Sequence, residues 1–133
     1  MRQYVRLQTS ILLRRLAFEV NRTAKTGDAD AIHDLRVAVR RLSRCLRAFS
    51  QFYPGRSWKK VRRKLHELMA ATGEVRDRDI AVELLLKAGI ESEASAIRIL
   101  EEERCSAAQH LSTVLHHWQE RSLSRKWRGE LGL

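Results

Sequence analysis

The chain has 133 residues, which is enough for one domain with a substantial core and too few for two. One proline, six glycines and 44% hydrophobic residues exclude an intrinsically disordered chain and favour a compact, mostly helical domain. The formal net charge of +10 favours an anionic partner if the cations gather on one surface.

The first two predicted helices cover residues 2–25 and about 28–53. A helical spacing of apolar residues defines both segments, and Gly27 stands between them as a helix-ending residue. Asp28 or Asp30 supplies the side-chain oxygen that caps the start of the second helix. The proline-glycine pair that follows this helix closes it.

Three further helices are predicted after that pair. Ser57 caps the third helix, which is expected to end at Gly73 because glycine commonly follows the last helical residue. The fourth covers residues 80–87, and the last begins after Ser92 and carries an apolar stripe as far as Trp118. Since no segment alternates with period two, we predict an all-α antiparallel bundle of about five helices with no sheet.

Residues 31–49, with the sequence AIHDLRVAVRRLSRCLRAF, place a row of polar side chains along one helix face. At about 100° per residue the row is about 80° wide, and it is about 21 Å long. Its members are His33, Arg36, Arg40, Arg44 and Arg47. The apolar residues of this helix fall on the opposite side, so we expect the row to face away from the core.

A basic outer face is an ordinary feature of a surface helix, because arginine is a good helix former. However, like charges three or four residues apart repel by about 0.2–0.5 kcal/mol per pair, and this row contains no carboxylate to relieve them. No acidic residue occurs anywhere between Asp34 and Glu67. We therefore favour a linear site for an anion over a merely solvated face.

Two motifs resemble the signature of the CHAD family, the conserved histidine α-helical domains. The first is the H-x-x-R-x-x-x-R spacing within residues 31–49. The second is ATGEVRDRDIAVELL, residues 71–85, in which a glycine and Arg-Asp-x-Asp precede an apolar helix. The resemblance covers roughly residues 5–128, strongly at these motifs and weakly in the last helix. It implies a helical bundle that binds inorganic polyphosphate on a basic surface.

The resemblance also implies which residues bind polyphosphate. From the first motif and its extension these are His33, Arg36, Arg40, Arg41, Arg44 and Arg47. Arginine suits this task because its planar guanidinium offers several donors to phosphate oxygens. Arg76 of the second motif carries over as a further ligand or, since Asp77 and Asp79 flank it, as a structural ion pair with a neighbouring helix.

The third helix adds a candidate second wall to the site. If its apolar residues set the core direction, one flank carries Lys59, Arg62 and His66. The remaining cations of this helix, Lys60, Arg63 and Lys64, are expected to point outward. An ordinary solvated basic face is the alternative interpretation, because Glu67 interrupts the run of cations.

The family commonly contains two related helical halves, whereas the histidine-arginine spacing occurs once in this chain. We therefore expect a single domain over residues 1–133 that corresponds to one half and either pairs with its own copy or binds with half a site. The prediction is a homodimer with the basic rows facing a shared groove. The long last helix, with Trp118 and Trp127, is expected to supply the apolar contact surface.

Catalysis is not expected, since the sequence has no G-x-x-x-x-G-K-[ST] loop and no Ser or Cys nucleophile with an identifiable histidine partner. His116 and His117 are adjacent on a helix and cannot easily bind one metal ion, so neither a metal nor another cofactor is predicted. The alternative function is sequence-independent binding of nucleic acid. The absence of aromatic residues from the basic row argues against that alternative.

The cellular setting expected from the sequence is the cytoplasm, with association with polyphosphate granules. The apolar run at residues 11–13 is stopped by Arg14, so it predicts neither a signal peptide nor a membrane span. Cys45 and Cys105 lack metal-ligand spacing, and both are predicted to be small hydrophobic residues of the core.

Overall fold

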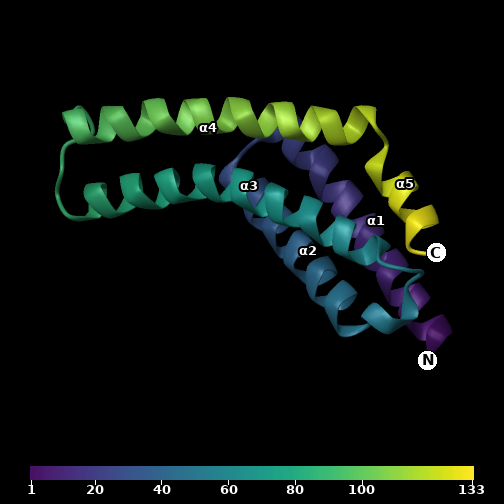
Figure 1. The fold of residues 1–133 in the computed structure, drawn as a ribbon. Helices are drawn as coiled ribbons and strands as arrows, with labels where there is room; N and C mark the ends of the chain where they lie inside the picture. The colour runs from purple at the N-terminus through teal and green to yellow at the C-terminus, as the bar shows by residue number, and fades with distance from the viewer.

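All 133 residues are described in the computed structural model, which has five α-helices, one short 3₁₀ helix and no strand. The helices are α1 (Arg2–Thr26), α2 (Ala29–Ala48), the 3₁₀ helix (Ser50–Phe52), α3 (Ser57–Lys87), α4 (Ser95–Glu120) and α5 (Leu123–Glu130). The long helices run antiparallel to their neighbours in sequence, and both termini lie at the same end of the molecule (Figure 1). The predicted all-α bundle without a sheet is confirmed.

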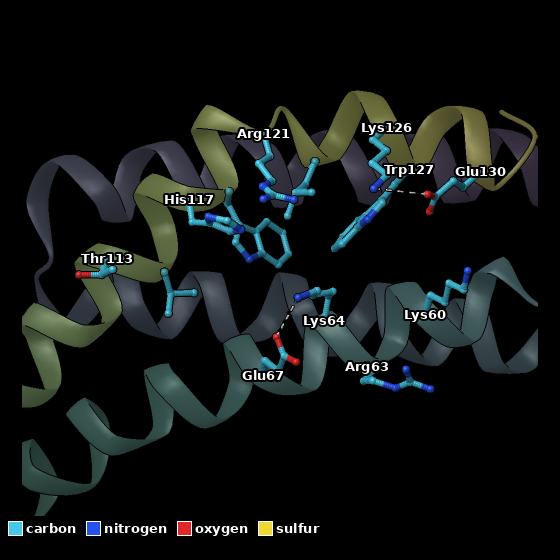
Figure 2. Close-up of a pocket in the computed structure, with 13 residues that line it drawn as sticks. Lys60, Arg63, Lys64, Glu67, Thr113, His117, Arg121, Lys126, Trp127 and Glu130 are labelled. Atoms are coloured by element: carbon cyan, nitrogen blue, oxygen red, sulfur yellow. Dashed lines mark hydrogen bonds and ion pairs between the residues drawn. The ribbon is translucent and has the colours of Figure 1, made fainter.

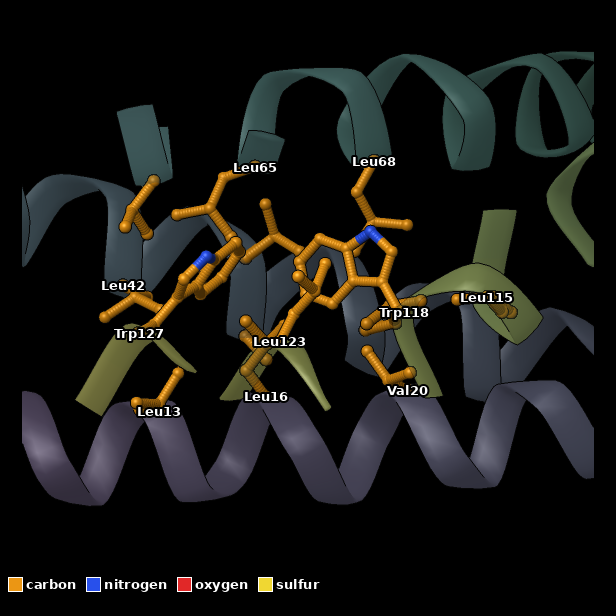
Figure 3. Packing of buried hydrophobic residues seen from close by; sticks show 14 of the residues in the cluster. Leu13, Leu16, Val20, Leu42, Leu65, Leu68, Leu115, Trp118, Leu123 and Trp127 are labelled. Atoms are coloured by element: carbon orange, nitrogen blue, oxygen red, sulfur yellow. The ribbon is translucent and has the colours of Figure 1, made fainter. Parts of the chain in front are cut away.

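One hydrophobic core joins all five α-helices. Figure 3 shows its centre, where side chains of every helix meet between α1 and α3. The labelled residues there are Leu13, Leu16, Val20, Leu42, Leu65, Leu68, Leu115, Trp118, Leu123 and Trp127. Each fully buried side chain of this size contributes about 1.5–3 kcal/mol of transfer free energy, so the core fixes how α2 and α3 lie against one another.

The far end of the α3–α4 hairpin projects beyond α1 and α2 as a two-helix arm (Figure 1). The buried residues of α3 stop at Val75, and the arm carries apolar side chains that remain exposed. These are Ile80, Leu84, Leu86, Ile90 and Ile99. The arm therefore presents apolar surface that no part of the chain covers.

The start of α2 follows the sequence prediction, and its end does not. Asp28 is the N-cap, and its side chain accepts a hydrogen bond of 2.8 Å from the backbone N–H of Ala31. Gly27 ends α1 with a φ of 61°, a conformation that glycine adopts without the steric cost of a side chain. The predicted extension of the second helix to Tyr53 is wrong, because α2 ends at Ala48 and a 3₁₀ turn follows.

The segments predicted as a third and a fourth helix form one helix of 31 residues, α3. Gly73 lies inside it and does not end it, so the expected break before residue 80 is wrong. Ser57 also does not cap the helix, because its hydroxyl donates to the carbonyl oxygens of Pro54 and Glu130. A side-chain link of this kind ties the start of α3 to the C-terminal segment.

The predicted long last helix is broken in two. Ser122, with a φ of 47°, separates α4 from α5, and α5 folds back along the bundle. As a result Trp127 packs edge-on against Trp118, with 4.9 Å between the ring centroids. Trp118 is 8% exposed and Trp127 is 3% exposed, so both are buried within one chain. The expectation that they supply the contact surface for a second copy is therefore wrong.

The two cysteines have different environments. Cys45 is buried, as expected, whereas Cys105 is exposed on α4, so its assignment to the core is wrong. None of the helices is both long enough and apolar enough to span a membrane.

Candidate functional site

The predicted row of cations on α2 lies beside α3, which supplies cations of its own. Most of the row is exposed, including His33, Arg40, Arg44 and Arg47. Arg36 is the exception, because its side chain is half-buried between the two helices. The expectation that the whole row projects away from the protein interior is therefore wrong for Arg36.

Arg36 holds α2 and α3 together. Its Nη1 donates hydrogen bonds to the Met69 carbonyl oxygen at 2.9 Å and to the Thr72 hydroxyl oxygen at 3.0 Å. Burial of the guanidinium lowers the pKa of Arg36 from its ordinary value, and the nearby charges of Arg76 and Arg40 act in the same direction. Arg36 thus combines a structural contact with a position inside a cluster of cations.

Gly73 makes room for that contact. A Cβ atom placed on Gly73 would lie 3.0 Å from Nη1 of Arg36, which is closer than ordinary packing allows. The glycine of the second motif therefore leaves space for the close approach of a side chain from α2 and does not form a turn.

A second contact fixes the register of the two helices. Arg62 of α3 donates from Nε to the Ser43 hydroxyl oxygen of α2 at 3.2 Å. Because the helices are antiparallel and Arg36 contacts Thr72, the same register places His66 opposite Arg40. Lys59 and Arg47 come opposite one another at the end of this row, where the Lys59 ammonium lies 5.6 Å from the ring centroid of Trp58.

We call the resulting surface the basic face. It comprises His33, Arg36, Arg40, Arg44, Arg47, Lys59, Arg62, His66 and Arg76. None of its arginines, nor its lysine, has a carboxylate within ion-pair distance, although ion pairs occur on every helix of the chain. The basic face is therefore a set of cations that the protein itself leaves uncompensated.

Arg76 does not form the structural ion pair considered as its alternative role. The ion pairs of the second motif belong to its neighbours, with Arg78 bound to Glu103 at 3.2 Å and Asp79 bound to Arg104 at 2.5 Å. These pairs connect α3 with α4. Arg76 instead lies within about 40° of Arg62 on the helical wheel of α3, on the same side as the basic face, and its charge lowers the pKa of Arg36.

Arg41 is the predicted ligand that lies apart from the others. It lines a shallow hollow of about 260 Å³ on the α1 side of α2, together with Arg15, His33 and Asp34. His33 borders both this hollow and the basic face, because it lies near the crest of α2. A single linear anion lying along α2 and α3 would therefore reach His33 more easily than Arg41.

A network of charges between α1 and α2 orients the row, and the sequence reasoning missed it. Arg22 donates to Asp34 at 2.6 Å and lies 3.4 Å from the buried carboxylate of Glu19, which Arg15 approaches at 3.3 Å. The hydrogen bond from Arg22 lowers the pKa of Asp34, and the charge of Arg22 adds to the effect. Asp34, the acidic residue beside His33, is thus paired with Arg22 of α1 and forms no ion pair with the cations of α2.

The basic face can hold an extended anion by charge-assisted hydrogen bonds. Arginine donors of α2 and α3 lie on the same face as the imidazoles of His33 and His66. No group of three or more His, Cys, Asp or Glu side chains is placed to hold a metal ion. The small residues Ala70, Ala71, Thr72 and Gly73 are the signal in the sequence that could have indicated the close contact between helices.

Comparison with known proteins gives one match. The family model described as CHAD domain matches residues 10–131 of the chain. No curated protein and no solved structure matches.

Proposed function

The chain belongs to the CHAD domain family, which is associated with polyphosphate binding, and we propose that it binds inorganic polyphosphate on the basic face without catalysing a reaction. Such binding would carry the protein to polyphosphate granules in the cytoplasm. The proposal requires no metal or other cofactor, because guanidinium and ammonium groups alone can neutralise a phosphate chain.

The observation that carries the proposal is that no arginine or lysine of the basic face forms an ion pair with a carboxylate of the protein. Cations three or four residues apart on a helix repel one another, and a protein normally relieves such repulsion with acidic neighbours. Here Arg40, Arg44 and Arg47 have no such partner, and burial and neighbouring charge disfavour the charged form of Arg36. An anion with a charge on every repeating unit would relieve all of them at once.

Nucleic acid is the competing ligand, since its backbone also presents phosphates in a row. Single-stranded nucleic acid is usually held by aromatic residues that stack on its bases, and the basic face has none. Phe49 and Trp58, the nearest aromatic residues in sequence, pack against the core. The basic face therefore fits a ligand that consists of phosphate alone.

A competition experiment tests the proposal. The protein is titrated with polyphosphates of several chain lengths, with heparin and with duplex DNA at equal concentrations of charged groups. We expect long-chain polyphosphate to displace DNA, and DNA to fail to displace polyphosphate. Preferential binding of DNA or heparin would overturn the assignment of polyphosphate as the ligand.

We also propose that the protein is a homodimer, and that the arm is the contact between copies. The face of α3 that carries Arg62, His66 and Arg76 continues past residue 76 as Ile80 and Leu84, which lie at nearly the same helical angle. Leu84 is 61% exposed. A second copy seated on these residues would join the two basic faces end to end, and a long polyphosphate could then bridge both copies.

A further inference from the structure

A pocket of about 480 Å³ lies between α3, α4 and α5, away from the basic face (Figure 2). Its α3 side carries Lys60, Arg63 and Lys64, the cations that were expected only to point outward. On a helical wheel these residues fall about 100–160° from Arg62 of the basic face. The pocket is therefore a separate site on another side of α3, and a ligand on the basic face does not reach it.

The pocket exists because the chain folds back at Ser122. Its floor is apolar and consists of Val114 and Trp118 of α4 with Leu123 and Trp127 of α5. This volume falls within the range of about 300–1,000 Å³ that is typical of pockets for small molecules. A bare inorganic anion would gain nothing from such a floor, whereas an apolar ring system would bury surface against it.

The indole groups of the floor have unused hydrogen-bonding capacity. Neither Trp118 nor Trp127 donates its N–H to any acceptor in the protein, although buried tryptophans usually do. The one fully buried side-chain polar atom without a hydrogen-bond partner is an oxygen of Glu19, so neither indole nitrogen is completely shielded from solvent. A ligand with acceptor atoms on its ring could receive these hydrogen bonds.

The rim of the pocket is cationic. Lys64 and Lys126 are held by glutamates of their own helices, at 3.4 Å from Glu67 and 4.0 Å from Glu130 (Figure 2). Lys60 and Arg121 have no carboxylate partner; Lys60 lies at the end of the pocket near Glu130, and Arg121 lies at the other end near His117 (Figure 2). An anionic group at the mouth would therefore meet cations from both walls.

We propose that this pocket binds an aromatic compound that carries phosphate groups and has the size of a mononucleotide. Its ring lies on the floor of Trp118 and Trp127, and its phosphates lie along the cationic rim that includes Lys60 and Arg121. The proposal does not depend on the function of the basic face, because the two sites share no residue.

The test uses three probes. Adenosine triphosphate contains both the ring and the phosphates of such a ligand, inorganic tripolyphosphate contains the phosphates alone, and adenosine contains the ring without phosphates. Tryptophan fluorescence is recorded in a Trp58→Phe variant of the full chain, in which the two remaining tryptophans both lie at the pocket. We expect a saturable change with the nucleotide, and at least about tenfold weaker binding of tripolyphosphate and of adenosine, since each lacks one half of the contacts.

Variants locate the response. Arg121→Ala with Lys60→Ala removes two pocket cations that have no carboxylate partner and should weaken nucleotide binding at least about tenfold. Lys60→Ala alone, which is remote from the turn at Ser122, should weaken it in the same direction if the double variant folds poorly. Arg40→Ala with Arg47→Ala removes two cations from the basic face and should leave the nucleotide response unchanged.

Three results would overturn the proposal. Equal binding of tripolyphosphate and nucleotide would mean that the pocket is only another cationic patch. Loss of the nucleotide response in the basic-face variant, but not in the pocket variant, would place the nucleotide elsewhere. If the nucleotide gives no saturable change in fluorescence, the pocket does not bind this class of ligand.

Discussion

Arg36 illustrates how much a single residue of the basic face contributes beyond its charge. A helical wheel places it with Arg40 and Arg47, yet only Arg36 reaches across to the backbone of α3 at Met69. A hydrogen bond from a charged group contributes about 1.5–3 kcal/mol when it is partly buried. Substitutions that report on ligand binding alone are therefore better made at Arg40 and Arg47, which are exposed and unpaired.

The contact between Arg22 and Asp34 should make stability depend on acidity. The hydrogen bond from Arg22 lowers the pKa of Asp34 in the folded protein below its value in the unfolded chain. The stabilisation is therefore fully present above the unfolded value of about 3.9. It is lost as the pH falls through the lower folded value. Denaturant unfolding at a series of pH values measures this loss.

Asp34→Asn provides the comparison for that series. This variant should lose stability at neutral pH and show a smaller further loss below about pH 4 than the parent, because the group that titrates has been removed. An acid dependence that is identical in the parent and in Asp34→Asn would contradict the role given to the pair.

The two histidines of the basic face should make polyphosphate binding depend on pH. Protonation of an imidazole adds a positive charge and a second N–H donor beside the arginines, so polyphosphate binding should tighten as the solution becomes more acidic. Binding titrations at several pH values measure the effect. His33→Gln with His66→Gln should flatten the dependence, whereas His110→Gln, an exposed change on α4, should not.

A pH dependence that survives in the His33→Gln, His66→Gln variant would contradict the participation of these histidines in binding. In the His110→Gln variant the pH dependence of the parent should persist, because His110 lies outside the basic face.

At the scale of elements, the sequence predicts the helices well where local signals decide them. Apolar spacing defines α1 and α2, and the aspartate cap at residue 28 fixes the start of α2. Gly73 misleads because a glycine reads as a helix end, although here it serves a contact with a residue 37 positions earlier. The run of small residues at positions 70–73 is the one local sign of that packing, and it does not show which residue makes the contact.

A double-mutant cycle tests the explanation for Gly73. In an ordinary helix Gly→Ala stabilises by about 1 kcal/mol. In this protein the new methyl group would displace the Arg36 guanidinium from Met69 and Thr72, so Gly73→Ala in the parent should give no stabilisation or a net loss. In an Arg36→Ala background the same change should stabilise by about 1 kcal/mol.

Denaturant unfolding of the four proteins of the cycle gives the coupling energy between residues 36 and 73. An effect of Gly73→Ala that is the same in both backgrounds would show that the two residues do not interact.

For the whole molecule, the sequence predicts part of the binding surface and misses the arrangement of the rest. Arg40, Arg44 and Arg47 are exposed on α2 as the helical spacing predicts, whereas Arg36 is half-buried against α3 and Arg41 lies on the α1 side. The pocket under α5 could not be predicted, since it depends on the reversal of the chain at Ser122. The same reversal removes Trp118 and Trp127 from the surface.

The arm should determine whether the protein associates with itself. Leu84→Glu places a charge in the proposed contact and should shift a dimer towards the monomer of 15.5 kDa. Leu7→Glu on α1 is the matched control, because Leu7 is 59% exposed and Leu84 is 61% exposed. Sedimentation with and without polyphosphate measures the shift, and polyphosphate should strengthen association of the parent by bridging two basic faces.

A parent protein that sediments as a monomer in both conditions would contradict the homodimer. A larger effect of Leu7→Glu than of Leu84→Glu would move the contact from the arm to α1.

The central claim, that polyphosphate binds the basic face, is tested most directly by comparing two variants of equal charge. Arg40→Ala with Arg47→Ala removes two cations from the basic face, and Arg14→Ala with Arg98→Ala removes two exposed, unpaired arginines from other surfaces. Both variants carry two positive charges fewer than the parent value of +10. Affinity for long-chain polyphosphate is measured for each over a range of salt concentrations.

We expect the basic-face variant to bind more than about tenfold more weakly than the parent. The slope of log affinity against log salt should become shallower by about 2 units, because each phosphate contact that is lost means about one counterion fewer released on binding. The control variant should stay close to the parent in both respects. An equal loss of affinity and slope in the two variants would show that polyphosphate responds only to net charge, and it would contradict a site on the basic face.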